Sequence, residues 1–381
     1  MTKPVDIAGQ SMDREIPLDK GRSLWSDALL RLRANKAAVT GIVVLVSIVI
    51  ACVVGPILSS HGFDQVYRSY VKVPASLTPY PRANEIEDGA RQALRRARVD
   101  IQSIETTKTG VEIKVTSSRD IDPRMTVYLD RSDMFSNGAV KTMAPDKKSA
   151  TLTADIQYLT FPFGTDANGR DLMTRTLMAG RISLTIGLLA TFVALTIGVT
   201  YGAVSGYFGG RVDSVMMRIV DILYSLPFIF FVIMLVVFFG RNFILMFVAV
   251  GCIEWLDMAR IVRGQTLSLK RQEFVQAAEA MGAGNAGILA RHIIPNTLGP
   301  VVVYMTLMVP KVILLESFLS FLGLGVQEPL SSWGVLISEG ARNLQGSSWM
   351  LLYPSLFLVA TLFALNFIGD GLRDALDPKD R

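Results

Sequence analysis

Six long apolar runs, separated by polar segments, constrain this chain more than any other feature. They cover residues 38–58, 182–204, 219–239, 243–262, 298–324 and 351–372. A helix needs about 20 mostly apolar residues to cross a lipid bilayer. Half of the 381 residues are hydrophobic, which is typical of a bundle of membrane helices. The pattern predicts an all-α polytopic membrane protein with about six transmembrane helices, the first at 38–58.

Two of the later runs contain proline, which interrupts helical hydrogen bonding. Pro227 is expected to kink the helix at 219–239. Pro310 lies in 298–324, so that run forms either one broken helix or two short segments. Cys52 and Cys252 lie inside apolar runs, far apart and without metal-ligand spacing, which favours packing roles.

The segment before the first run, 1–37, is polar and contains a short amphipathic pattern. Trp25, Leu29 and Leu32 fall on one helical face, so we expect a helix that lies on the cytoplasmic membrane surface or packs on protein. Because the first apolar run starts so late, it is interpreted as an uncleaved anchor. The last segment, 376–381, is expected to be a cytoplasmic tail.

The segment 59–180 has no run long enough to span a membrane. A helix is predicted at 85–98, and alternating apolar residues predict strands at 111–115, 125–129 and 150–156. Turn residues bound these elements: Gly110, Pro123 and Asn137-Gly138. We therefore expect a small α+β domain, at about 84–158, inserted between the first two spans and outside the membrane.

The positions of Lys and Arg predict the orientation of the bundle. Basic residues gather before the first run, in alternate short loops and after the last run, which is typical of the cytoplasmic side. Both termini are therefore expected in the cytoplasm, and 59–180 on the opposite side. The arginines at 91–98 depart from this rule, but long loops translocate regardless of charge.

Sequence patterns for enzymatic chemistry are missing. The chain has no Gly-Lys dipeptide, hence no phosphate-binding loop of the Walker type, and no Gly-x-Ser-x-Gly nucleophile turn. His61 and His292 have no neighbours at metal-ligand spacing. We predict no catalytic residues, no metal site and no cofactor bound by this chain. The net charge of +5 sits beside apolar runs, so lipid is the expected partner and nucleic acid is not.

Ionisable side chains inside the apolar runs are candidates for function, because burying charge in a membrane is costly. Glu254 and Asp257 are followed by Arg260, and an i,i+3 ion pair between Asp257 and Arg260 is the simplest interpretation. Lys311 and Glu316 lie near the middle of 298–324. They contact each other, a neighbouring helix, or a wet translocation path. The candidate path residues are Lys311, Glu316 and Ser320.

The segment 264–296 carries the most specific motif. An Ala-rich helix begins near Phe274 and is expected to stop at Gly282, and a second segment is expected to break at Pro295. The sequence resembles the permease subunits of bacterial ABC importers, whose motif is Glu-Ala-Ala, three residues, Gly, and later Leu-Pro. Here the corresponding residues are Gln276-Ala277-Ala278, Gly282 and Ile294-Pro295, with Gln in place of the usual Glu.

Further stretches make the sequence similar to the second permease of the dipeptide/oligopeptide branch. They are 163–171, 180–184, 206–221, 259–265, 319–327, 332–334 and 366–378. The resemblance implies a type I importer permease fold with a five-helix core at 181–375. Relatives usually have a shorter segment between the first two spans, and a small or apolar residue at the position of Lys311.

The same resemblance implies roles and partners. Phe274, Gln276, Ala277, Ala278, Gly282 and Pro295 would couple this chain to ATPase subunits, and Trp333 would contact a solute-binding protein. The complex would hold a second, different permease, two ATPases that bind ATP and Mg²⁺, and an extracytoplasmic binding protein, in a bacterial inner membrane. It would import di- or oligopeptides or a related solute such as nickel complexes, glutathione or oligosaccharides.

Two other functions remain open at this point. A self-contained channel or secondary transporter would need no ATPase, but would leave the 264–296 motif unexplained and is more often marked by internal repeats. A membrane-anchored sensor would need only one span.

Overall fold

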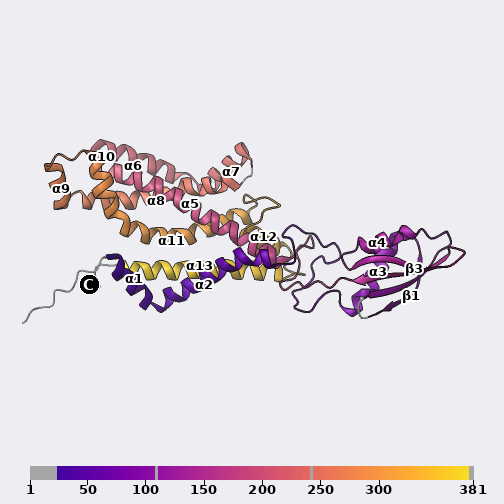
Figure 1. Ribbon diagram of the computed structural model, residues 1–381. Coiled ribbons are helices and arrows are strands. Elements are labelled where there is room, and N and C mark those ends of the chain that lie inside the picture. Colours follow the sequence, from indigo (N-terminus) through magenta and orange to yellow (C-terminus); the bar gives the residue numbers. More distant parts are fainter. Residues whose placement is uncertain (1–23, 108–109, 241–242, 377–381) are drawn as a thin grey trace, which may run out of the picture.

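A bundle of long helices and a separate α/β domain lie end to end in this chain (Figure 1). The computed structural model describes residues 24–107, 110–240 and 243–376. Most of the predicted tail 376–381, and the first 23 residues of the predicted N-terminal segment, lie outside the described residues. The sequence-based expectation of a helical membrane core with a small sheet insertion is confirmed.

Helices form at all six apolar runs. They are α2 (Lys36–Leu58), α5 (Leu172–Phe208), α6 (Gly210–Ser225) with α7 (Phe228–Phe239), α8 (Phe243–Leu269), α11 (Ile294–Phe321) and α13 (Trp349–Leu376). Within the described ranges, four stretches are long and apolar enough to cross a membrane, and a fifth is counted if α6 and α7 form one span. Helix α8 is not among them, because Glu254, Asp257 and Arg260 interrupt its apolar sequence.

Proline has different effects in two of these helices. Pro227 separates α6 from α7, which meet at 83°, so the predicted kink is a sharp break. The predicted break at Pro310 is wrong, because α11 runs without interruption through Pro300 and Pro310. Pro310 is buried, and packing of neighbouring helices around a proline lets membrane helices tolerate it.

The centre of the bundle is the close pairing of α5 with α8. Small residues on α5 allow this approach: a side chain at Gly202 would collide with the backbone of Ala259, and one at Gly206 with Thr266. Helix α1 (Leu24–Ala34) is a short helix that contacts the end of α13, where Gly371 lies against Leu32 and Asn35. Asn35 caps α2 by accepting hydrogen bonds from Ala37 and Ala38.

The α/β domain is one antiparallel sheet of order β1-β2-β4-β3, covered on one face. Its strands are β1 (Asp100–Thr106), β2 (Gly110–Thr116), β3 (Phe135–Met143) and β4 (Ser149–Ile156). Helix α3 (Ala83–Leu94), the 3-10 turn Arg95–Ala97 and α4 (Val127–Asp130) complete it. Alternate residues of β2 and β4, such as Ile113 and Leu152, pack on Ile86, Leu94 and Leu129 to form its core.

The predicted strand at 125–129 is wrong. These residues form a 3-10 turn, Pro123–Thr126, and then α4. Asp122 caps the turn by accepting a hydrogen bond from the Arg124 backbone nitrogen. Met125 and Leu129 are both buried, and a spacing of four residues suits a helical turn as well as a strand.

An aromatic cluster joins the domain to the bundle. Tyr67, Tyr70, Tyr80 and Phe161 have ring centroids 5.4 to 6.4 Å apart. Tyr80 and Leu159 form an antiparallel bridge with two backbone hydrogen bonds, so the chain leaves for the domain and returns from it at one place.

Candidate functional site

A short helix, α9 (Glu273–Ala280), stands at the end of the bundle opposite the α/β domain (Figure 1). The predicted segment 264–296 begins inside α8, which continues to Leu269. Val275 and Ala278 of α9 are buried in the core of the bundle. Alanine and glutamate are strong helix formers, which explains why so short a segment is helical here.

The rest of α9 faces outward. The sequence-predicted residues Gln276 and Ala277 are exposed, Phe274 is 42% exposed, and Met281 is 82% exposed. Phe274 lies 6.5 Å from the ring of His292. Large apolar side chains on a short helix beyond the membrane spans are typical of a protein–protein contact. This surface, Phe274, Gln276, Ala277 and Met281, is called the α9 face below.

Gly282 ends α9 in a Schellman motif. Its nitrogen donates to the Glu279 carbonyl at 2.9 Å, and the Ala283 nitrogen donates to the Ala278 carbonyl at 3.0 Å. The φ of Gly282 is +84°, in the left-handed region, and nothing lies near enough to fill the space beside it. Glycine is therefore needed for backbone geometry and not for space.

Two polar contacts tie the segments on either side of α9 to α5. Lys270 donates to the Tyr207 carbonyl at 2.6 Å and lies over the Tyr207 ring. The Tyr207 hydroxyl lies 3.1 Å from Asn285 Oδ1, on α10 (Asn285–Ile288). A displacement of α9 would therefore be passed to α5 as well as to α8.

The predicted break at Pro295 is wrong. A π-helical turn, Leu289–Ile293, leads directly into α11, so one helix continues from Asn285 to Phe321. The Ile294 nitrogen donates to the Leu289 carbonyl in this turn, immediately before the proline that has no donor of its own. The local irregularity lies before the proline, at Leu289–Ile293.

A charged cluster lies between α8 and α11. Lys311 Nζ is 2.9 Å from Glu254 Oε2 and 3.0 Å from Asp257 Oδ2. Arg260 instead pairs with Asp221 at 2.9 Å, so the predicted Asp257–Arg260 pair does not form. Lys311 thus neutralises carboxylates of a neighbouring helix, one of the three arrangements that the sequence left open.

A cavity of about 310 Å³ opens beside this cluster. Leu223, Tyr224, Phe228, Glu254, Asp257 and Lys311 are among the residues that line it. It lies where α6 and α7 meet, next to α8. Apolar walls with a few charged groups are typical of a site that holds a polar solute.

The two other candidate path residues lie elsewhere. Glu316 is fully buried, and its carboxylate accepts hydrogen bonds from Ser320 at 2.7 Å and from Ser183 at 3.2 Å. Ser320 in turn accepts a hydrogen bond from Ser332. Neither Glu316 nor Ser320 lines the cavity at Lys311. They hold α11 against α5 and the start of α12.

Trp333 is the first residue of α12 (Trp333–Arg342) and is fully buried. Its indole nitrogen donates to the Thr176 carbonyl at 3.0 Å, and its backbone nitrogen donates to Ser183 at 3.2 Å. The ring packs on Gly180 and Phe357. No surface of this side chain is free for the predicted contact with a binding protein, so we withdraw that assignment.

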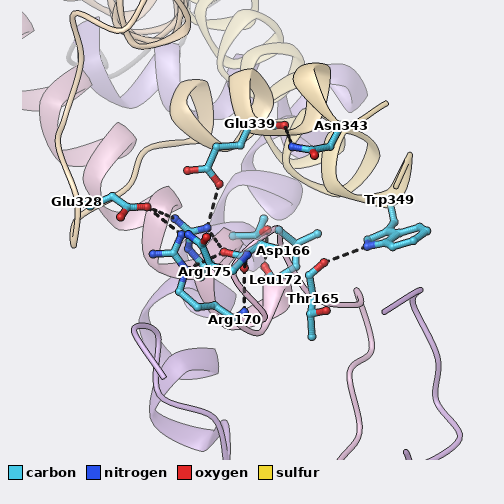
Figure 2. A network of polar contacts seen from close by, with 11 residues as sticks. Thr165, Asp166, Arg170, Leu172, Arg175, Glu328, Glu339, Asn343 and Trp349 are labelled. Atoms are coloured by element: carbon cyan, nitrogen blue, oxygen red, sulfur yellow. Dashed lines mark hydrogen bonds and ion pairs between the residues drawn. The ribbon is translucent and has the colours of Figure 1, made fainter. Parts of the chain in front are cut away.

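A buried polar network fixes the end of the bundle nearest the α/β domain (Figure 2). Asp166 accepts hydrogen bonds from Arg170 Nε at 2.7 Å and from Arg175. Arg170 reaches Glu328 at 2.8 Å, and Arg175 reaches Glu339 at 3.0 Å. The start of α5 is thus joined to the loop after α11 and to α12.

The network also affects ionisation and helix capping. Burial would lower the pKa of Arg170, but the hydrogen bonds to Glu328 and Asp166 raise it above its ordinary value. Asp171 caps α5 by accepting a hydrogen bond from the Thr174 nitrogen at 2.8 Å. Within the described residues, no group of His, Cys, Asp and Glu is placed to hold a metal ion.

Two family models match the chain. Residues 198–381 match the binding-protein-dependent transport system inner membrane component, and residues 23–79 match the N-terminal transmembrane domain of oligopeptide transport permease C. Together they cover an N-terminal and a C-terminal part of the chain.

Individual relatives agree with this result. The oligopeptide transport system permease protein OppC of Escherichia coli K12 is 46% identical over 362 residues, which are 95% of this chain and 93% of the relative. The dipeptide transport system permease protein DppC of Bacillus subtilis is 50% identical over 220 residues, 58% of this chain and 69% of the relative.

Among solved structures, an inward-facing form of the MetNI methionine ABC transporter aligns with a TM-score of 0.46 and 17% identity, covering 54% of this chain and 96% of that one. The family itself follows from the E. coli OppC relative, whose similarity extends over nearly the full chain. This chain belongs to the oligopeptide- and dipeptide-type permeases, the inner membrane components of binding-protein-dependent transport systems.

Proposed function

We propose that this chain forms half of the translocation pathway of a peptide importer, and that α9 is the element through which ATP hydrolysis in partner subunits drives it. The two relatives described above are permeases of oligopeptide and dipeptide transport systems. The observation that supports the coupling role is the α9 face, which is exposed and apolar at the end of the bundle opposite the α/β domain.

The complex would contain this chain, a second and different permease, two ATPases and an extracytoplasmic binding protein. ATP and Mg²⁺ would be held by the ATPases. Both termini would lie in the cytoplasm together with α9, and the α/β domain would lie outside. The basic residues that flank 264–296 support this orientation, and α1 and α9 lie at the same end of the bundle (Figure 1).

The coupling step would be a rigid-body movement. When the ATPases close, they would displace the α9 face. The Schellman turn at Gly282 and the Tyr207 contacts with Lys270 and Asn285 would pass that displacement to α5, α8 and α11. Gln276 replaces the usual Glu and donates to the Arg271 carbonyl at 3.2 Å, so it braces the start of α9 from within the chain.

Lys311 would line the path of the peptide. It is the one predicted path residue that borders the cavity between α6, α7 and α8. Its ammonium group is paired with Glu254 and Asp257, so the three side chains together would present charged groups to the passing peptide.

Site-directed crosslinking tests the α9 assignment. In a chain with Cys52 and Cys252 replaced by Ser, F274C should crosslink to an ATPase subunit in the assembled complex. The matched control is L344C, at an exposed residue between α12 and α13, which should not crosslink to the ATPase.

Purification of the tagged chain in mild detergent tests the complex. Recovery of a second permease and of ATPases with vanadate-sensitive hydrolysis is the expected outcome. Purification as a homo-oligomer without ATPase would instead favour a channel or secondary transporter.

A further inference from the structure

A cleft in the α/β domain gathers five arginines that the transport mechanism leaves unused. Its volume is about 500 Å³. The arginines come from three segments: Arg96 and Arg98 from the turn after α3, Arg119 and Arg124 from the segment between β2 and α4, and Arg131 just after α4. Folding therefore brings together charges that are up to 35 positions apart in the sequence.

None of the five guanidinium groups makes an ion pair or a side-chain hydrogen bond within the described part of the chain. Elsewhere in the domain, basic side chains do have partners: Arg91 pairs with Glu87, Lys114 with Glu105, and Lys141 with Glu112. The arginines of the cleft thus lack the side-chain partners that these other basic residues have.

The positive charge is concentrated in the cleft and is not spread over the whole domain. Residues 83–156 hold twelve Lys and Arg and twelve Asp and Glu. Five of these twelve cations but only two of the acids, Asp120 and Asp122, line the cleft. One oxygen of Asp122 already accepts a hydrogen bond from the Arg124 backbone. Several like charges close together repel one another, so the arrangement lowers stability unless an anion offsets it.

The type of the basic residues indicates the chemical class of the ligand. All five cations are arginine, whose planar fork of donors matches the paired oxygens of phosphate and carboxylate groups. The walls also include apolar and aromatic surface, from Val99, Ile121 and Tyr128. We propose that this cleft is a binding site for a multivalent oxyanion, a ligand that carries at least two phosphate or carboxylate groups.

Titration calorimetry on the full chain tests this proposal. The chain is placed in nanodiscs of zwitterionic phosphatidylcholine, at about 0.15 M ionic strength so that diffuse attraction is screened. Inorganic tripolyphosphate is the probe, and citrate tests whether carboxylates suffice. The wild-type chain should bind tripolyphosphate saturably with one site per chain.

Three variants distinguish specific binding in the cleft from nonspecific attraction to the positive charges of the domain. R96Q/R124Q/R131Q removes one arginine from each segment and should weaken binding about tenfold or more. The matched control K114Q/K141Q/K148Q removes three charges from the same domain outside the cleft and should bind as the wild type does. R119E adds a repulsive charge at an exposed position, so it tests the site even if the triple variant does not fold.

A competition experiment distinguishes a lipid headgroup from a soluble anion as the source of the oxyanion. If vesicles containing cardiolipin, whose headgroup carries two phosphates, displace tripolyphosphate, the site accepts lipid headgroups; if they do not, it accepts a soluble anion. Both results support the site. Equal weakening in the cleft variant and the control, unchanged binding by R119E, or no saturable binding of either probe would overturn it.

Discussion

At the scale of single residues, buried charge is the feature with the clearest consequences. Glu254 is 3% exposed, and Lys311 is the cation within ion-pair distance of it. Removing one partner of a buried ion pair leaves the other uncompensated, which costs more than losing an exposed pair. The contacts of Lys311 can therefore be tested through stability as well as transport.

We predict that K311M lowers the free energy of unfolding by about 2–3 kcal/mol, at the low end of the range for buried pairs because the lysine itself is half exposed. Thermal melting of the purified chain measures this. Replacing Glu254 as well, in K311M/E254Q, should recover part of the loss. R91Q, which breaks an exposed pair on α3, should change stability by less than about 1 kcal/mol. If K311M and R91Q lowered the free energy of unfolding equally, the ion pairs of Lys311 would contribute no more than an exposed pair, and the prediction would be wrong.

Trp333 gives the second prediction at this scale. W333F should keep the ring in its pocket but lose the hydrogen bond to the Thr176 carbonyl, which costs about 1 kcal/mol. Because the side chain is fully buried, the affinity of the complex for its binding protein should be unchanged. A drop in that affinity, in a variant whose melting temperature matches the wild type, would restore the contact that we withdrew.

At the scale of elements, the Schellman turn after α9 is the most specific target for a substitution. G282A places a side chain at a φ of +84° and should destabilise the turn by about 1–2 kcal/mol, although space is open around it. Peptide-stimulated ATPase activity of the complex should fall. The matched control is G284A, where φ is −71° and space is equally open, and activity should remain. If both variants behave alike, the turn geometry is not what matters.

Local patterns predicted some elements and not others. The alternation at 111–115 and 150–156 predicted β2 and β4, because one face of each strand is buried. Strands β1 and β3 were missed, since their burial patterns are weak and β3 contains irregular register at Asn137-Gly138. The break expected at Pro310 does not occur in α11, because packing of the surrounding structure decides whether a proline breaks a helix, and that packing is not local.

The candidate sites also differ in whether the local sequence predicts them. Gly282 could be predicted because a helix stop and its cap lie within a few residues. The network at Asp166 could not, since Arg170 and Glu328 are 158 positions apart and only the fold brings them together. The cavity at Lys311 depends likewise on the meeting of four helices, α6, α7, α8 and α11.

At the scale of the whole molecule, the bundle and the α/β domain have separate cores. One cluster of buried residues runs through α5, α8 and α11, and another joins the sheet with α3 and the aromatic cluster. The chain passes between them at the Tyr80–Leu159 bridge. A domain attached at one place can in principle be removed without cutting the bundle.

We predict that replacing residues 81–158 by Asn-Gly leaves a chain that still assembles with its partners. The two backbone hydrogen bonds between Tyr80 and Leu159 are those of a closing hairpin pair, and Asn-Gly favours the two-residue turn that such a pair accepts. Tyr70 and Phe161 remain to pack on Tyr80, and Tyr67 remains to pack on Phe161. ATPase activity in detergent should be kept, while tripolyphosphate binding should disappear. A matched cut that replaces 166–175 with the same turn removes the Asp166 network and should prevent assembly, because that network holds α5 to α12. If the shortened chain is degraded or purifies without ATPases, the domain is part of the structural framework of the permease and not an attached module.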